Sequence, residues 1–260
     1  MILLSFVFPA FPWQIEPFQK EKFPPGWENQ TILNIVFIPL GYQKKDSFKK
    51  DVFLIITYLK NTPPFNQFKG FRFYILSIAS KEKNILFKKS QNFPYLEVRN
   101  DLISGIKNEL NYPYKLVVLD KQINISAAEV SNAKATSIII LGRNSYGRKN
   151  RLAKAFLHEL GHSLGLREEN PGSSQPIIFG PPNCAPDKET AKKWWGNLTK
   201  EIDGVGYFKI PSGNKTFIKP TRSSIMNNPF KSSGYGPVNE RYLCQELKIP
   251  VTLYFVTEKK

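Results

Sequence analysis

The chain has 260 residues, of which 41% are hydrophobic and 22% are charged, and its formal net charge at pH 7 is +16. This length is enough for one substantial hydrophobic core, whereas no apolar run approaches the ~20 residues of a membrane-spanning helix. The sequence also shows no internal repeat and no low-complexity tract. Composition therefore argues against a repeat protein and predicts a soluble, enzyme-sized protein without stable membrane insertion.

The positive charge raises the question of a nucleic-acid ligand, because lysine and arginine side chains neutralise phosphates. No nucleic-acid-binding motif accompanies the lysines, which include scattered pairs at Lys44–Lys45, Lys49–Lys50, Lys88–Lys89 and Lys192–Lys193. We therefore expect a solvated, lysine-rich surface and no nucleic-acid partner. A basic protein that binds polyanions remains an alternative.

The first 30 residues open with the apolar run MILLSFVFPAF, which lacks the charged start of an export signal. They form either a weak signal-like segment or an apolar arm or edge strand packed on the domain. Under the first interpretation the protein is secreted or associated with the cell envelope. Cys184 and Cys244 could pair in an oxidising compartment, but we favour free, partly buried thiols.

Ahead of residue 150 the pattern predicts strands with helices. Strands are expected at about residues 32–40, 71–78, 115–119 and 137–141. One helix follows the first strand, is capped by Asp46, and carries Phe48, Val52, Ile55, Ile56 and Leu59 at helical spacing. A second helix is expected near residues 101–110. The prediction is a mixed α/β sheet with packed helices, forming an upper lobe at about residues 31–165.

The stretch HELGHSLGLREE, residues 158–169, contains both histidines of the chain. His158 and His162 lie four residues apart, so on a helix their imidazoles share a face and can bind one metal ion. Zinc accepts such donors readily. The helix is anchored by an apolar stripe next to the histidines, consisting of Ala153, Phe156, Leu157, Leu160 and Leu164.

A catalytic zinc ion usually has three protein ligands, so a third must follow the histidines. Gly165 can end the helix in a left-handed turn, and Glu168, ten residues after His158, is then directed back toward the ion. Glu169 remains an alternative ligand. Glu159, next to His158, is the expected general base, because its carboxylate can reach the open position of the metal.

The pattern HExxHxxGxx with a third ligand resembles that of the metzincin zinc peptidases. One family in particular is similar, the immunoglobulin A peptidase family of zinc metallopeptidases. The similarity spans about residues 32–247 and rests on LNIVFIPLGYQKKDSFKKDVFLIITYLKNTPPFNQFKGFRFYIL, NCAPDKETAKKWWGNL, SIMNNPF and YGPVNERYLCQEL. Members typically carry Asp-Glu-Tyr where this chain has Glu168-Glu169-Asn170, so the family match also selects Glu168. The immunoglobulin substrate is not implied, because nothing in this sequence specifies it.

This resemblance implies a zincin-like domain over residues 31–260, with an irregular lower lobe at about residues 166–250 that ends in a helix near residues 238–247. Met226, in the sequence SSIMN, would form the Met-turn beneath the zinc ion. Tyr235 is a candidate for stabilising an oxyanion, although packing in a loop is the simpler expectation. The same holds for Trp194 and Trp195, which could line the cleft but are expected to pack in a core or lobe.

The sequence thus predicts a zinc-dependent metallopeptidase, an endopeptidase that acts on protein or peptide substrates with one catalytic Zn²⁺ ion. A catalytically silent binding module that retains zinc is the first alternative, and a polyanion-binding protein is the second. The intact Glu159 favours the enzyme, because a structural zinc site does not require that carboxylate. The oligomeric state stays open.

Overall fold

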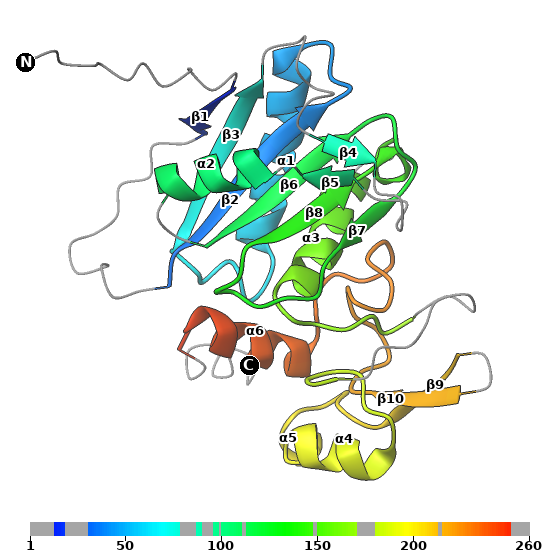
Figure 1. Ribbon diagram of the computed structural model, residues 1–260. Coiled ribbons are helices and arrows are strands. Elements are labelled where there is room, and N and C mark those ends of the chain that lie inside the picture. Colours follow the sequence, from blue (N-terminus) through cyan, green and yellow to red (C-terminus); the bar gives the residue numbers. More distant parts are fainter. Residues whose placement is uncertain are drawn as a thin grey trace, which may run out of the picture.

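A computed structural model describes residues 13–18, 31–78, 87–89, 96–98, 100–110, 113–147, 150–170, 180–212 and 215–250. These residues form a mixed α/β structure with a six-stranded mixed sheet (Figure 1). The four central strands are parallel and the two edge strands are antiparallel to their neighbours. Across the sheet the order is β1 (Trp13–Pro17), β3 (Phe71–Ile78), β2 (Leu33–Leu40), β6 (Tyr114–Asp120), β8 (Ser137–Leu141) and β7 (Ser126–Ala128).

Helices cover both faces of this sheet, as crossover connections between parallel strands require. The side chains of β2 alternate between the two faces, because successive residues of a strand point in opposite directions. Ile35 and Phe37 pack in one hydrophobic cluster with α1 and α3, whereas Val36 and Ile38 pack in another with α2. The bounds of these helices are Lys45–Asn61 for α1, Asn100–Leu110 for α2 and Arg151–Ser163 for α3.

The strands and helices predicted ahead of residue 150 are confirmed, with bounds within one residue. The predicted cap of α1 is wrong, because Lys44 occupies the N-cap position and makes no side-chain hydrogen bond there. Asp46 lies inside the first turn, where its charge interacts favourably with the helix dipole. The edge strand β1 lies within the first 30 residues, where an edge strand was one of the interpretations, but the pattern gave no bounds for it. The pattern did not predict the edge strand β7, since three residues carry too little alternation to stand out. The same applies to the small hairpin of β4 (Phe87–Lys89) and β5 (Leu96–Val98).

The described part of the chain after Gly165 lies below the sheet in Figure 1. It contains a small core of its own around Trp195, whose ring is fully buried and whose Nε1 donates to the carbonyl of Gly206 at 2.9 Å. The expectation that this tryptophan packs rather than lines a cleft is therefore confirmed. The elements of this part are α4 (Lys188–Trp195), α5 (Leu198–Glu201), the hairpin of β9 (Phe208–Ser212) and β10 (Lys215–Lys219), and α6 (Pro237–Leu247).

The cysteines, the apolar N-terminal run and the length of the helices bear on expectations about the whole chain. Cys184 and Cys244 are both buried and free, as expected. The apolar start MILLSFVFPAF lies outside the described residues, and the edge strand β1 begins after it, at Trp13. Within the described ranges, no helix is both long and apolar enough to cross a membrane.

Candidate metal centre

Helix α3 ends where the sequence predicted, in a turn that redirects the chain. Gly165 has φ of +107°, a left-handed conformation that other residues adopt only with strain. Its N–H donates to the carbonyl of His162, and the N–H of Leu166 donates to the carbonyl of Gly161, both at 2.9 Å. This pair of bonds is a Schellman motif, which satisfies the last carbonyl groups of the helix. The chain then reverses and passes back across the histidines.

The reversal brings Glu168 to the two histidines. Its Oε2 lies 3.1 Å from Nε2 of His158 and 3.7 Å from Nε2 of His162, and the two Nε2 atoms are 3.2 Å apart. One ligand atom from each residue lies within 4.8 Å of the others. The structure therefore brings together the three residues that the sequence selected as ligands.

Both histidines are held by hydrogen bonds to backbone carbonyl groups. Nδ1 of His158 lies 2.9 Å from the carbonyl oxygen of Ile225, and Nδ1 of His162 lies 2.9 Å from that of Leu166. A carbonyl oxygen only accepts, so each Nδ1 carries the hydrogen. In the neutral imidazoles the lone pair is then on Nε2, the atom that faces Glu168.

The donor set fits a zinc ion. Zinc bonds of 2.0–2.1 Å in a tetrahedron place the ligand atoms about 3.3 Å from one another. The observed separations of 3.1, 3.2 and 3.7 Å bracket that value. In the neutral imidazoles the two Nε2 lone pairs and the carboxylate oxygen converge on one point, where a metal cation, or in its absence a proton on His158, stabilises the arrangement. Two imidazoles and a glutamate are also a known ligand set of catalytic zinc.

The ionisation of these groups reflects their mutual contacts. Burial acts to lower the pKa of His158, but the hydrogen bond that its Nε2 donates to Glu168 and the charges of Glu159 and Glu168 raise it to about 9. Burial acts to raise the pKa of Glu168, but its hydrogen bonds to His158 and His162 lower it to about 2. The carboxylate of Glu168 is thus ionised at neutral pH, as a metal ligand must be.

Glu159 follows His158 on α3 and is 6% exposed. Burial raises the pKa of its carboxyl group, the charges of the two histidines lower it, and the charge of Glu168 raises it again. A carboxylate whose proton affinity is raised by burial is a better proton acceptor than one in water. Position and environment both suit the general base that the sequence predicted.

Glu169 has partners other than the histidines. Its carboxylate is fully buried, and it accepts hydrogen bonds from Nδ2 of Asn183 at 3.0 Å, Nδ2 of Asn239 at 2.8 Å and Oγ of Ser224 at 2.5 Å. Its N–H donates to the carbonyl of Met226 at 3.1 Å. Glu168 and Glu169 therefore point to opposite sides of one chain segment, and the bonds of Glu169 fix that segment against two distant parts of the chain.

Asn183 strengthens the same segment from the other side. Its Oδ1 accepts from the N–H of Arg167 and its Nδ2 donates to the carbonyl of Arg167, both at 2.9 Å. Sequence reasoning did not identify Asn183, Ser224 or Asn239, because a single polar residue in a loop gives no periodic signal. All three lie within stretches on which the family resemblance rests or directly beside them.

Met226 is fully buried beneath α3. A Cβ placed on Gly161 would lie 2.5 Å from Sδ of Met226 and 3.0 Å from the ring of Tyr235. Gly161 thus allows both side chains to approach the helix between the two histidines. The hydroxyl of Tyr235 donates to the carbonyl of Leu157, and the ring is fully buried against Phe65. This position agrees with the packing role that the sequence allowed for Tyr235.

Lys115, on β6, supports the end of α3 from the sheet. Its side chain is fully buried, and its Nζ donates to the carbonyl groups of Asn132, Ala135 and Ser163, each at 2.8 Å. Burial lowers the pKa of the ammonium group to about 8, although the charge of Glu246 acts to raise it. The ammonium group of Lys115 therefore donates to one carbonyl group in the last turn of α3 and to two in the loop between β7 and β8. The sequence pattern treated Lys115 only as the start of a strand.

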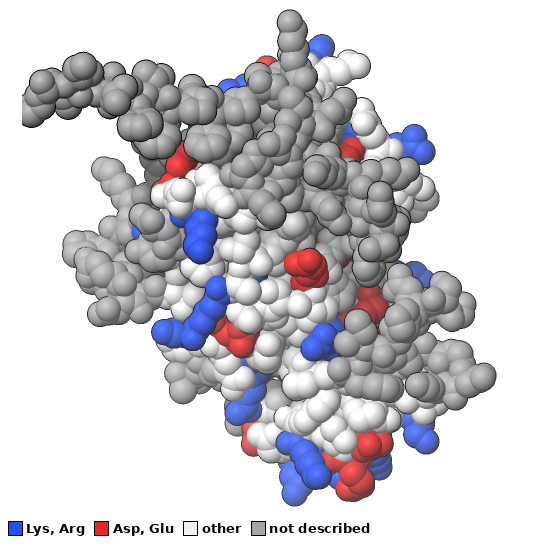
Figure 2. All heavy atoms as spheres, in the orientation of Figure 1, with Lys and Arg blue, Asp and Glu red and all other residues white. Residues whose placement is uncertain are grey.

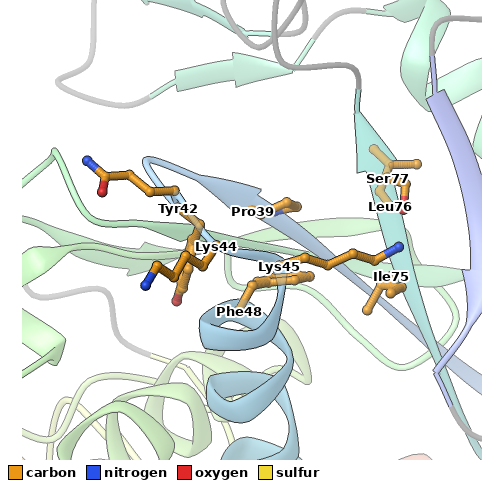
Figure 3. A pocket seen from close by; sticks show the side chains of 9 residues that line it. Pro39, Tyr42, Lys44, Lys45, Phe48, Ile75, Leu76 and Ser77 are labelled. Atoms are coloured by element: carbon orange, nitrogen blue, oxygen red, sulfur yellow. The ribbon is translucent and has the colours of Figure 1, made fainter.

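Two hollows accompany this arrangement. A hollow of about 290 Å³ lies between α1, α3 and the segment around Ile225, and it includes Lys154 and Leu157 of α3. The other, of about 270 Å³, lies at the start of α1, where Lys45 extends toward Ser77 (Figure 3). There Nζ of Lys45 lies 3.6 Å from Oε2 of Glu16, and Oγ of Ser77 donates to Oε1 of Glu16 at 3.0 Å. The first hollow lies nearer the candidate metal centre, because it is lined by Ile225, whose carbonyl oxygen accepts from Nδ1 of His158.

The comparisons with known proteins add no assignment to this geometry. No family model matches the chain, and no curated protein matches it. The candidate metal centre, formed by His158, His162 and Glu168 with Glu159 beside them, is therefore what carries the functional argument.

Proposed function

We propose that this chain is a zinc-dependent endopeptidase with a metzincin-like site, in which His158, His162 and Glu168 hold the metal. The observation that carries the proposal is the convergence of two Nε2 atoms and one carboxylate oxygen at 3.1–3.7 Å from one another. Bonds from each Nδ1 to a carbonyl group prepare the imidazoles for this role. The resemblance of the sequence to the immunoglobulin A peptidase family supports the same reaction.

A bound zinc ion supplies Lewis-acid chemistry, polarising a peptide carbonyl and lowering the pKa of water toward ~7. The protein residues supply the rest. Glu159 accepts the proton of the attacking water and delivers it to the departing amine, which its position next to His158 allows. Leu166 and Ile225 keep the imidazoles oriented through their carbonyl groups. The Schellman motif at Gly165 maintains the approach of Glu168.

The two alternatives are less well supported. A silent zinc-binding module has no use for a buried carboxylate directly beside the ligands, and Glu159 is such a carboxylate. A polyanion-binding protein concentrates its cations along one stripe or groove. On the face shown in Figure 2, the described Lys and Arg side chains lie apart from one another, with acidic side chains between them. This distribution favours a solvated basic surface.

Metal analysis combined with peptide cleavage tests the proposal. We expect about one zinc ion per chain and cleavage of a denatured protein mixture that a chelator abolishes and added zinc restores. Glu159→Gln should retain zinc while turnover falls at least ~10²-fold, because the base is lost and the ligands remain. Glu201→Gln, an exposed glutamate at the end of α5, is the matched control and should retain full turnover. Folded protein that takes up no zinc, or unchanged turnover in Glu159→Gln, would refute the proposal.

A further inference from the structure

The hollow between α1, α3 and the segment around Ile225 begins next to the candidate metal centre. Leu157, in its wall, directly precedes His158, and the carbonyl of Ile225, another wall residue, holds Nδ1 of His158. Lys154 lies four residues before His158, one turn along the same face of α3. The hollow and the candidate metal centre are thus connected through Ile225 and through one face of α3.

Lys154 is the one charged residue among the nine described residues that line the hollow. Its Nζ donates to the carbonyl groups of Phe230 and Ser232, both at 3.4 Å. These long bonds tether the ammonium group at the wall and use two of its three hydrogens, which leaves the third for a ligand. Neither partner is anionic, so within the described part of the chain the positive charge of Lys154 has no counter-charge in contact with it.

The other lining residues are uncharged. Leu157 and Ile225 are apolar, whereas the rest are polar. They come from the end of α1, with Thr57, Tyr58, Asn61 and Thr62, and from Ser232 and Ser233. The hydroxyl groups of Thr57 and Thr62 donate to carbonyl groups within α1, and so does the amide of Asn61. These groups thus turn their hydrogens toward the helix. Lys154 is consequently the group that selects the charge of whatever enters.

We propose that this hollow is a substrate subsite for an acidic side chain, Asp or Glu, of a residue next to the scissile bond, and that Lys154 determines this specificity. The inference rests on the proposed peptidase function, which it extends to a substrate class. A carboxylate in the hollow replaces water around the free hydrogen of Lys154 and forms an ion pair shielded by the walls of α1 and α3. A lysine or arginine at the same substrate position is repelled.

Cleavage-site profiling of a peptide library with the zinc-loaded protein tests this subsite. We expect Asp and Glu to be enriched at one position next to the cleaved bond, by about threefold or more over Asn and Gln, the scale of one partly shielded ion pair. Lys154→Met removes the charge at similar length and should abolish the enrichment, Lys154→Arg should preserve it, and Lys154→Glu should shift it toward Lys and Arg. Lys193→Met, on the exposed side of α4, is the control that leaves the profile unchanged.

A binding measurement separates this inference from the proposed function. Peptides that differ only by Glu or Gln at each position in turn are titrated by fluorescence anisotropy against the Glu159→Gln variant, which should bind without turnover. Tighter binding of one Glu peptide that Lys154→Met eliminates supports the subsite even if no cleavage is ever detected. Cleavage without acidic preference, or a preference that survives in Lys154→Met, overturns the subsite and leaves the peptidase standing.

Discussion

Two parts of the chain build the candidate metal centre by different means. Helix α3 supplies His158 and His162, and helical spacing alone places their side chains on one face. The segment from Arg167 to Glu169 supplies one ligand, but it has no regular structure. Its position depends on hydrogen bonds to Asn183, Ser224 and Asn239.

Different interactions hold the ligands of the two parts in position. Apolar packing holds α3, because Phe156, Leu160 and Leu164 are fully buried against the sheet and α1. Polar contacts hold the later segment, since Glu169 collects three side-chain hydrogen bonds in a fully buried position. Zinc affinity should therefore respond strongly to changes in the polar network and weakly to changes in packing.

The largest effect should follow the loss of the ligand from the irregular segment. Glu168→Gln replaces an anionic ligand by a weaker, neutral one, so zinc affinity should fall by more than the ~10- to 100-fold that an outer partner contributes. Competition with a chelating dye measures this change. Glu169→Gln should change affinity little, because the amide keeps an oxygen for Asn183 and Asn239. If Glu169→Gln lowered zinc affinity more than Glu168→Gln, Glu169 would be the ligand and Glu168 would not.

The second-largest effect on zinc affinity should follow the loss of the hydrogen bonds around Glu169. Glu169→Ala leaves the donors on Asn183, Ser224 and Asn239 without an acceptor, which should lower the free energy of unfolding by roughly 3 kcal/mol or more. Because these bonds orient Glu168, zinc affinity should also fall ~10- to 100-fold. Denaturant titration and dye competition measure the two effects. If stability fell while the affinity of the folded protein stayed the same, the network would not position the ligand.

The support of α3 from the sheet should affect stability more than the metal. Lys115→Met removes three hydrogen bonds to carbonyl groups, which should lower the free energy of unfolding by about 3 kcal/mol. Zinc affinity should change less than in Glu169→Ala, because apolar packing still holds the helix. Lys134→Met, an exposed lysine of the nearby loop, is the control and should change stability little. A larger loss of zinc than in Glu169→Ala would contradict the comparison.

Lys115 also makes stability depend on pH. Its pKa is about 8 in the folded protein and returns to about 10.5 on unfolding. Between these values the unfolded chain binds more protons than the folded one, so stability should rise with pH relative to that of Lys115→Met. Below pH 8 the difference between the two proteins should be constant. Denaturant titrations of both proteins from pH 7 to pH 10 test the sign, and a difference that shrinks with pH would contradict it.

The smallest effect should come from packing beneath the site. Met226→Leu replaces one apolar side chain by another of similar volume, so stability should fall by less than ~1.5 kcal/mol and zinc should be retained. Because Sδ of Met226 lies close to Gly161, the cost of the replacement depends on how well the shape of the leucine fits there. A metal content as low as that of Glu168→Gln would give Met226 a role beyond packing.

The features that could be predicted from the sequence depend on local patterns, and those that could not depend on distant contacts. Strands β2, β3, β6 and β8 and the turn at Gly165 could be predicted, because their signals are local periodicity and one glycine. The choice between Glu168 and Glu169 could not be made from their immediate neighbours. It depends on Asn183, Ser224 and Asn239, which lie 14, 55 and 70 residues from Glu169. The burial of Lys115 was equally hidden, because its acceptors lie on a loop and on α3.

Glu169 and Ser224 lie 55 residues apart, which affects the order in which the candidate metal centre forms during synthesis. All three candidate ligands precede residue 170, so a growing polypeptide carries them well before the segment that orients them. The carbonyl of Ile225 and the hydroxyl of Ser224 reach the site only after that later segment is synthesised and folded. The candidate metal centre is therefore complete only late in synthesis, when a further 55 residues have followed Glu169.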